Sequence, residues 1–122
     1  MEDRSKDRSL QEPTLLLLTA LADAPRHGYA LLQEVDAISG GRVKLRTGTL
    51  YGALDRLLGQ GLVRVVSEEV VDGRARRVYA LTDGGRAVLT AEAERLRAVA
   101  AEAERRLAAA ARSPKLRSGF AS

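Results

Sequence analysis

The stretch TGTLYGALDRLL, residues 47–58, decides the fold. Its leucines recur at the i, i+4, i+7, i+8 spacing of one apolar helix face: Leu50, Leu54, Leu57 and Leu58. Two hydroxyl residues at its start, Thr47 and Thr49, are candidates to cap the helix. The glycines of residues 59–61 end it. The sequence therefore predicts one amphipathic helix with a leucine face turned inward and a polar face left for other contacts.

After this helix the pattern changes to the period of two that is typical of strands. Alternating and β-branched runs occupy residues 62–66, 70–71 and 78–81, and Asp72-Gly73 lies between them. Asp-Gly is a strong hairpin signal because both central residues of a type I′ turn need positive φ. The pattern predicts a small β-hairpin whose second strand carries Arg74, Arg76 and Arg77.

Two helices are predicted before residue 47. The first opens at residues 11–14, with Pro13 in its first turn, and continues through an apolar run to residue 22. The second runs over about residues 27–38 and ends at Ser39-Gly40-Gly41. Tyr29 is interpreted as a core residue on the apolar stripe of this helix, and His27 at its start as a structural residue rather than a ligand or pH sensor.

Residues 82–111 are predicted to form one long helix opened by Thr82-Asp83. Small and apolar residues on it alternate at spacings of four and three, which is a heptad seam: Leu89, Ala93, Leu96, Ala100, Ala103 and Leu107. Such a seam favours self-association of two copies, and folding of the helix back onto its own domain is the alternative. These six residues are the predicted dimer interface.

Composition narrows the function classes. The chain has 122 residues, no cysteine and one histidine, so we expect one domain, no disulfide, no metal site and no cofactor. Residues 1–9 lack an apolar signal core, and the longest apolar run is far shorter than the roughly 20 residues of a membrane span. No constellation of catalytic groups is visible, and Glu68-Glu69 is interpreted as a solvated strand face. We expect a cytoplasmic binding module, not an enzyme or a membrane protein.

Positive charge gathers in one part of the chain. The net charge is +4, and residues 42–77 hold eight basic and four acidic residues. A basic block on one part of a domain is typical of a phosphate-binding face. The candidate DNA contacts lie before the predicted helix, on its polar face and on the hairpin: Arg42, Lys44, Arg46, Thr47, Thr49, Tyr51, Arg56, Arg74, Arg76 and Arg77.

The order of elements is that of a winged helix-turn-helix followed by a long C-terminal dimerisation helix, a mainly α fold with a small β-hairpin wing. We predict a polar disordered arm at residues 1–9, a DNA-binding domain at 10–81, a dimerisation helix at 82–111 and a disordered basic tail at 112–122. In this architecture the third helix enters the major groove of double-stranded DNA. A winged-helix protein-interaction module without sequence-specific DNA binding is the alternative, and the basic residues argue against it.

Four motifs together carry a family resemblance. HGY at residues 27–29, GTLYGALDRL at 48–57, GLV at 61–63 and RVYALTDGGR at 77–86 resemble the successive signatures of PadR-like transcriptional regulators, in the subgroup with a single C-terminal helix. The resemblance implies a homodimeric repressor that binds a pseudo-palindromic operator. It also implies that residues 47–58 are the recognition helix and residues 65–81 the wing.

Two departures bear on the expected mechanism. Gly52 stands where the family often has proline. The long helix has no aromatic residue, whereas some members of the subgroup bind flat apolar effectors between aromatic side chains on it. Leu96 and its alanine neighbours could line only a narrow apolar gap, so the resemblance leaves room for a small apolar effector but not for stacking between aromatic rings.

Overall fold

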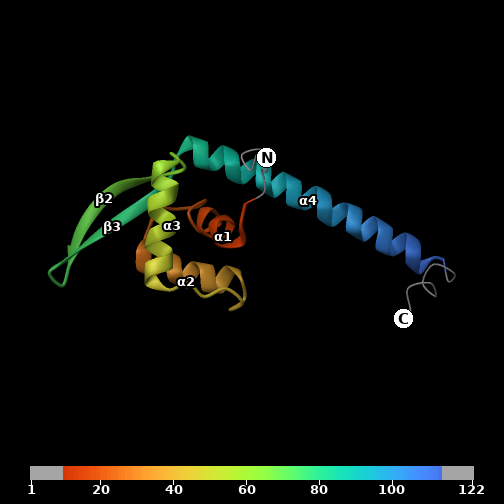
Figure 1. The fold of residues 1–122 in the computed structure, drawn as a ribbon, viewed down its shortest axis with the longest axis horizontal. Helices are drawn as coiled ribbons and strands as arrows, with labels where there is room; N and C mark the ends of the chain where they lie inside the picture. The colour runs from red at the N-terminus through yellow and green to blue at the C-terminus, as the bar shows by residue number, and fades with distance from the viewer. Residues whose placement is uncertain (1–9, 114–122) are drawn as a thin grey trace, which may run out of the picture. The chain divides into compact units, whose positions relative to one another are not determined.

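The computed structural model describes residues 10–113. In chain order its elements are α1 (Glu12–Ala20), β1 (Arg26–His27), α2 (Gly28–Ile38), α3 (Thr47–Gly59), β2 (Val63–Val71), β3 (Arg74–Leu81) and α4 (Asp83–Ala111). Figure 1 labels the helices and the two longer strands. The chain divides into two compact units, Met1–Thr90 and Ala91–Ser122. The predicted arm at residues 1–9 and nearly all of the predicted tail lie outside the described residues.

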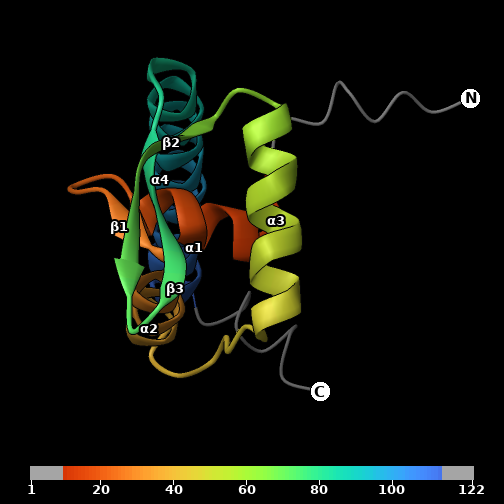
Figure 2. The same ribbon diagram turned by 90° about the vertical axis from the view of Figure 1, so that its left-hand side faces the viewer.

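The first unit is a winged helix-turn-helix, as predicted. Its sheet is antiparallel with the strand order β1-β3-β2. Asp72 and Gly73 have φ values of 52° and 76°, which confirms the predicted Asp-Gly turn. The tip of the β2–β3 hairpin and the first turn of α3 lie at the same end of this unit (Figure 2). The wing and the start of the third helix can therefore act on one ligand.

Two features of the sheet were not predicted. Strand β1 adds Arg26 and His27 to the hairpin, opposite Tyr79 and Val78. Two residues are too few for a periodic signal, so only the tertiary fold reveals this strand. The β2–β3 register also shifts between Val65 and Ser67, which leaves one extra residue on β2. Such a bulge increases the local twist of a hairpin.

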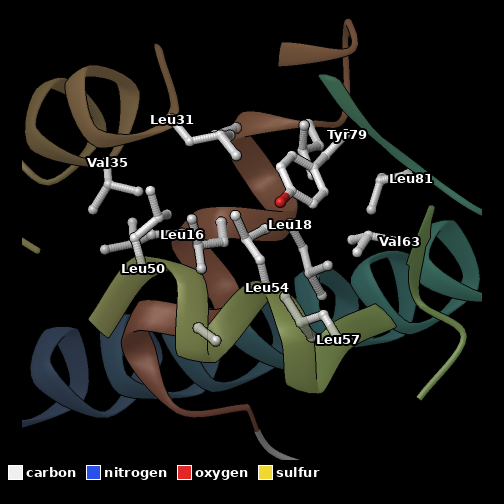
Figure 3. Packing of buried hydrophobic residues seen from close by; sticks show 14 residues of the cluster. Leu16, Leu18, Leu31, Val35, Leu50, Leu54, Leu57, Val63, Tyr79 and Leu81 are labelled. Atoms are coloured by element: carbon white, nitrogen blue, oxygen red, sulfur yellow. The ribbon is translucent and has the colours of Figure 1, made fainter. Parts of the chain in front are cut away.

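One apolar core holds the first unit together. The leucine face of α3 packs against α1, α2 and the sheet (Figure 3), and Leu50, Leu54 and Leu57 are fully buried. The other elements supply the remaining large side chains of the cluster: Leu16, Leu17, Leu18, Leu31, Val35, Val63, Tyr79 and Leu81. Burying one such side chain contributes about 1.5–3 kcal/mol to folding, so α3 can expose its opposite face without losing its place.

The ends of α3 show one confirmed and one wrong prediction. Gly61 has a φ of 74°, and the Leu62 amide donates to the Leu57 carbonyl at 3.0 Å, so the glycine ends the helix as expected. Neither threonine hydroxyl caps the start. Thr47 is already the first helical residue, Arg46 takes the cap position, and no side chain bonds the first amides. These backbone N–H groups therefore remain available to a ligand.

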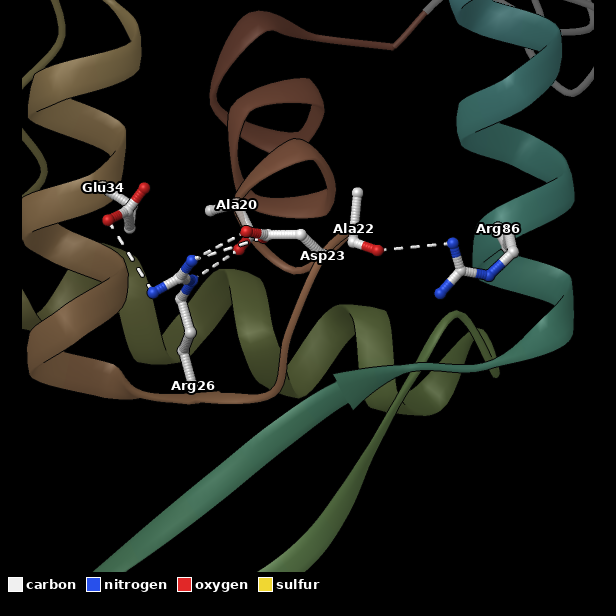
Figure 4. A network of polar contacts seen from close by, with 6 residues as sticks. All are labelled: Ala20, Ala22, Asp23, Arg26, Glu34 and Arg86. Atoms are coloured by element: carbon white, nitrogen blue, oxygen red, sulfur yellow. Dashed lines mark hydrogen bonds and ion pairs between the residues drawn. The ribbon is translucent and has the colours of Figure 1, made fainter.

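Arginine side chains fix the corner between α1, α2 and the start of α4 (Figure 4). Arg26 donates from Nε to the Ala20 carbonyl at 2.8 Å and lies 3.3 Å from Asp23 and 3.7 Å from Glu34. Arg86 donates to the Ala22 carbonyl at 3.3 Å. These bonds satisfy carbonyls that the end of α1 would otherwise leave without a partner.

The start of α4 follows its predicted cap. The Thr82 hydroxyl accepts from the Gly85 amide at 3.0 Å and donates to the Gly61 carbonyl at 2.6 Å. Of the predicted seam, Leu89 packs in part against the core of the first unit. The other five residues are exposed in the single chain, Leu96 to 39% and Leu107 to 70%. Val99, which was not predicted as part of the seam, is also exposed.

The contact between α4 and the end of α3 yields a stability prediction. A Cβ at Gly85 would lie 2.0 Å from the Leu62 carbonyl oxygen, whereas one at Gly84 would come no closer than 3.4 Å to the Gly61 oxygen. Gly85→Ala should therefore lower the free energy of unfolding by about 1–3 kcal/mol. The matched control, Gly84→Ala, should change it by less than about 0.5 kcal/mol. Urea unfolding followed by circular dichroism measures both, and equal effects would contradict this packing.

Candidate nucleic-acid interface

The face of α3 opposite its leucines is open to solvent. Its exposed residues run along the whole helix: Thr47, Gly48, Thr49, Tyr51, Gly52, Asp55, Arg56 and Gly59. The uncapped amides of the first turn lie at the start of this face. A helix start attracts anions because its N–H groups and the helix dipole are both positive there. The exposed face of α3 thus combines hydroxyls, one arginine and a positive end.

The three predicted wing arginines occupy the outer half of β3. Alternation along the strand places Arg77 on the same side as Tyr79, and Arg74 and Arg76 on the other. Arg77 forms an ion pair with Glu68 across the hairpin at 3.5 Å. The Arg76 guanidinium lies 3.4 Å from Nε2 of His27. Arg76 and Arg77 therefore have different partners within the chain.

A groove of about 750 Å³, here called the wing groove, is lined by all three wing arginines and by Tyr51 of α3. It lies between the start of α2, the middle of α3 and the hairpin. Its lining residues are Gly28, Tyr29, Tyr51, Asp55, Val71, Asp72, Arg74, Ala75, Arg76, Arg77 and Tyr79. Four predicted DNA contacts, Tyr51 and the three arginines, thus share one groove. Nothing in the sequence shows that α2 would complete it.

Tyrosine side chains shape the wing groove. A Cβ on Gly28 would lie 2.2 Å from the Tyr51 hydroxyl oxygen, so Tyr51 reaches α2 through the space that the glycine leaves. Tyr79 is buried in the core. Burial raises the pKa of the Tyr79 hydroxyl, and a hydrogen bond with Arg77 acts in the opposite direction.

Arg56 and Thr49 lie on another side of α3. They line a second groove of about 340 Å³ next to the start of α1, with Gln11, Thr14 and Gly52 among its other residues. Helical geometry puts Tyr51 and Arg56 well apart around the axis. The predicted contacts on α3 therefore flank its exposed face on both sides.

Two of the three predicted bases before α3 are paired within the chain, and the third, Arg46, takes the cap position of the helix. Arg42 forms a bidentate ion pair with Glu12, and its guanidinium lowers the pKa of the Glu12 carboxyl, chiefly through the hydrogen bond. Lys44 donates to Asp36 at 3.0 Å. Exposed pairs of this kind contribute little to stability, so both cations can exchange a carboxylate for a phosphate.

Sequence reasoning misplaced Tyr29. Tyr29 is 63% exposed and lines the wing groove, so its predicted core position is wrong. The buried face of α2 is formed by Gly28, Leu31 and Val35, and Tyr29 points away from it. The sequence prediction assigned Tyr29 to the apolar stripe of α2, but the buried stripe begins one residue earlier, at Gly28. The HGY motif was the sequence signal that could have drawn attention to Tyr29. His27 has the structural role expected, because its Nδ1 accepts from the Ala30 amide at 3.3 Å.

Within residues 10–113, no group of three or more His, Cys, Asp or Glu side chains could hold a metal ion. None of the helices in this part of the chain is both long and apolar enough to cross a membrane. A shallow depression on α4 is lined by Ala98, Val99, Glu102, Ala103 and Arg106.

Comparison with known proteins gives the family. The model of the transcriptional regulator PadR-like family matches residues 17–91. The transcriptional regulator Rv3488 of Mycobacterium tuberculosis is 44% identical over 86 residues, which cover 70% of this chain and 77% of that protein. A protein of transposon TN4556 from Streptomyces fradiae is 47% identical over 79 residues, 65% of this chain, but the chain spans only 21% of its length.

Solved structures share the fold. A PadR family regulator from Clostridium difficile superposes with a TM-score of 0.66 at 21% identity, covering 80% of this chain and 99% of that one. Bacillus subtilis PadR, solved in complex with operator DNA, has a TM-score of 0.59 at 18% identity and covers 66% of this chain and 46% of that one. With the family model matching most of the winged unit, the chain belongs to the PadR-like family of transcriptional regulators.

Proposed function

We propose that this protein is a sequence-specific DNA-binding regulator that acts in the cytoplasm as a homodimeric repressor. The observation that carries the proposal is the wing groove, where Arg74, Arg76 and Arg77 of the hairpin line the same groove as Tyr51 of α3. A winged helix places its third helix in the major groove and its wing along the backbone. Operator DNA bound by Bacillus subtilis PadR supports this use of the fold.

Phosphate contacts and contacts from the exposed face of α3 make different contributions to DNA binding. Arginine and lysine side chains on the wing and before α3 supply affinity by releasing counterions from phosphates. Thr47, Thr49, Tyr51 and Arg56 lie on the exposed face of α3, where they set register and part of the sequence preference. The first amides of α3 add a phosphate contact.

The homodimer forms through α4. Its exposed seam of Ala93, Leu96, Ala100, Ala103 and Leu107 repeats every seven residues, the pattern by which one helix packs against an equal helix. Alanines allow close approach of the two backbones. The seam fixes the distance between the two winged units, and a pseudo-palindromic operator presents half-sites about 34–36 Å apart.

A small apolar effector is proposed to release the repressor. It would bind against the alanine-rich face of α4 near Leu96 and favour another crossing angle of the two helices, which changes the spacing of the winged units. Transcription from a template that carries the upstream region of the protein's own gene tests the sense of regulation. A fall in transcript on adding the protein supports repression, and a rise contradicts it.

The wing assignment makes a prediction about salt. Arg76→Ala should weaken binding to every duplex and reduce the slope of log affinity against log salt by about one, because one phosphate contact is lost. Fluorescence anisotropy with duplex from upstream of the protein's own gene, beside a scrambled duplex, measures this. Arg64→Ala, on β2 but outside the wing groove, is the matched control and should leave the slope unchanged. An unchanged slope in Arg76→Ala would show that Arg76 of the wing does not contact a DNA phosphate.

The seam assignment makes a prediction about assembly. Leu96→Glu should place a charge in the apolar seam, convert the dimer to a monomer and abolish tight operator binding. Ala101→Glu, an exposed alanine on α4 outside the seam, serves as control and should remain dimeric. Sedimentation equilibrium gives the mass of each variant. A dimeric Leu96→Glu variant with unchanged operator affinity would rule out the seam.

A further inference from the structure

Asp55 is an acidic side chain on the surface that the proposed function assigns to DNA. It is exposed on α3 and lines the wing groove together with the wing arginines. Of the other acidic residues near the proposed interface, Asp36 pairs with Lys44 and Glu68 with Arg77, whereas Asp72 in the wing groove and Glu69 on β2 have no ion pair within residues 10–113. Within residues 10–113, Asp55 has no basic partner within 4.0 Å. A carboxylate in this place meets phosphate repulsion unless a specific donor faces it.

Three glycines and one tyrosine neighbour Asp55 on the surface of α3. At 100° per residue, Gly48, Gly52 and Gly59 lie on its side of the helix, opposite the buried leucines. A Cβ on any of these glycines would meet nothing within 4 Å, so packing within the chain does not require glycine at these positions. Tyr51, four residues before Asp55, is also exposed on this side, and its hydroxyl reaches α2 at Gly28.

The flanking glycines and the short side chain favour the same kind of contact. The aspartate carboxyl lies only one bond beyond Cβ, so it reaches a base edge only where the helix backbone comes close to the groove floor. Glycines three residues before it and four residues after it allow that approach. A longer glutamate or arginine would not need flanking glycines.

The chemistry selects the base. An ionised carboxylate can only accept hydrogen bonds. In the major groove cytosine presents its N4 amino group as a donor, and aspartate pairs with it. We propose that Asp55 reads a C·G pair in each half-site by accepting a hydrogen bond from cytosine N4. This inference rests on the proposed DNA-binding function and names a specificity-determining residue for it.

A simpler role gives a different outcome. If Asp55 only offsets the positive charge of Arg74, Arg76 and Arg77, its removal strengthens binding to all sequences equally and leaves the preferred sequence unchanged. If it reads cytosine, its removal erases the preference at one position of each half-site. Asparagine separates the two roles further, because its amide pairs with adenine N6 and N7.

Selection from a pool of randomised duplexes tests the inference with the full-length chain. The wild type should enrich a motif with a C·G pair at one position of each half-site, preferred about tenfold over the other pairs. Asp55→Ala should lose that preference and retain the rest of the motif. Asp55→Asn should shift the same position toward A·T.

Asp72→Asn is the matched control. This substitution also removes one negative charge from the wing groove. Asp72 has a positive φ, which asparagine tolerates, so the turn should be preserved. It should keep the C·G preference. Thermal melts should show that the Asp55 variants stay folded, since the residue is exposed.

The possible outcomes distinguish base reading by Asp55 from sequence-specific DNA binding by the whole protein. An Asp55→Ala motif identical to that of the wild type, with higher affinity for all duplexes, overturns the reading role and leaves DNA binding intact. A lost position that presents no cytosine amino group also overturns it. A wild type that enriches no motif overturns the proposed function itself, and this inference with it.

Discussion

The burial of one face of α3 is the constraint on which the rest of the first unit depends. Leu50, Leu54 and Leu57 have no exposed surface, and they are surrounded by side chains from α1, α2 and the sheet. Since a helix face and its opposite are fixed together by the 3.6-residue period, burying the leucines determines which residues α3 exposes. The core of the winged unit therefore fixes both the exposed face of α3 and its position relative to the β2–β3 hairpin.

The exposed ion pairs of this unit add little to stability, and their cations can exchange a carboxylate for another anion. Arg42, Lys44 and Arg77 each pair with an exposed carboxylate in the free protein. Such pairs are weak because solvent screens them. A phosphate can therefore replace the carboxylate at small cost. Asp55 and Asp72 line the wing groove without an ion pair in residues 10–113, and of the two only Asp55 lies on α3, the helix proposed to contact bases.

Local signals explain what the sequence could predict. The leucine spacing of α3, the Asp-Gly turn and the glycine that ends α3 each depend on residues close together in the chain, and all three were predicted. The direction of Tyr29 depends on which face of α2 meets α1, and β1 depends on a strand more than fifty residues away. Neither could be derived from local periodicity.

The candidate site shows the same division. Its residue types and the elements that carry them were predictable, because basic and hydroxyl residues cluster around residues 42–77. Their grouping was not. Tyr51 shares a groove with the wing arginines, whereas Arg56 and Thr49 line another beside α1. That separation follows from the packing of α3 on α1 and the sheet, a tertiary property.

The central claim is that DNA meets the exposed face of α3 and the wing groove. Titration of the ¹⁵N-labelled protein with duplex from upstream of its own gene tests it most directly, with amide chemical shifts as the readout. The account predicts the largest shifts in the first turns of α3, at Gly28 and Tyr29, and along β3 from Arg74 to Arg77. Shifts confined to α4, or none at all, would contradict it.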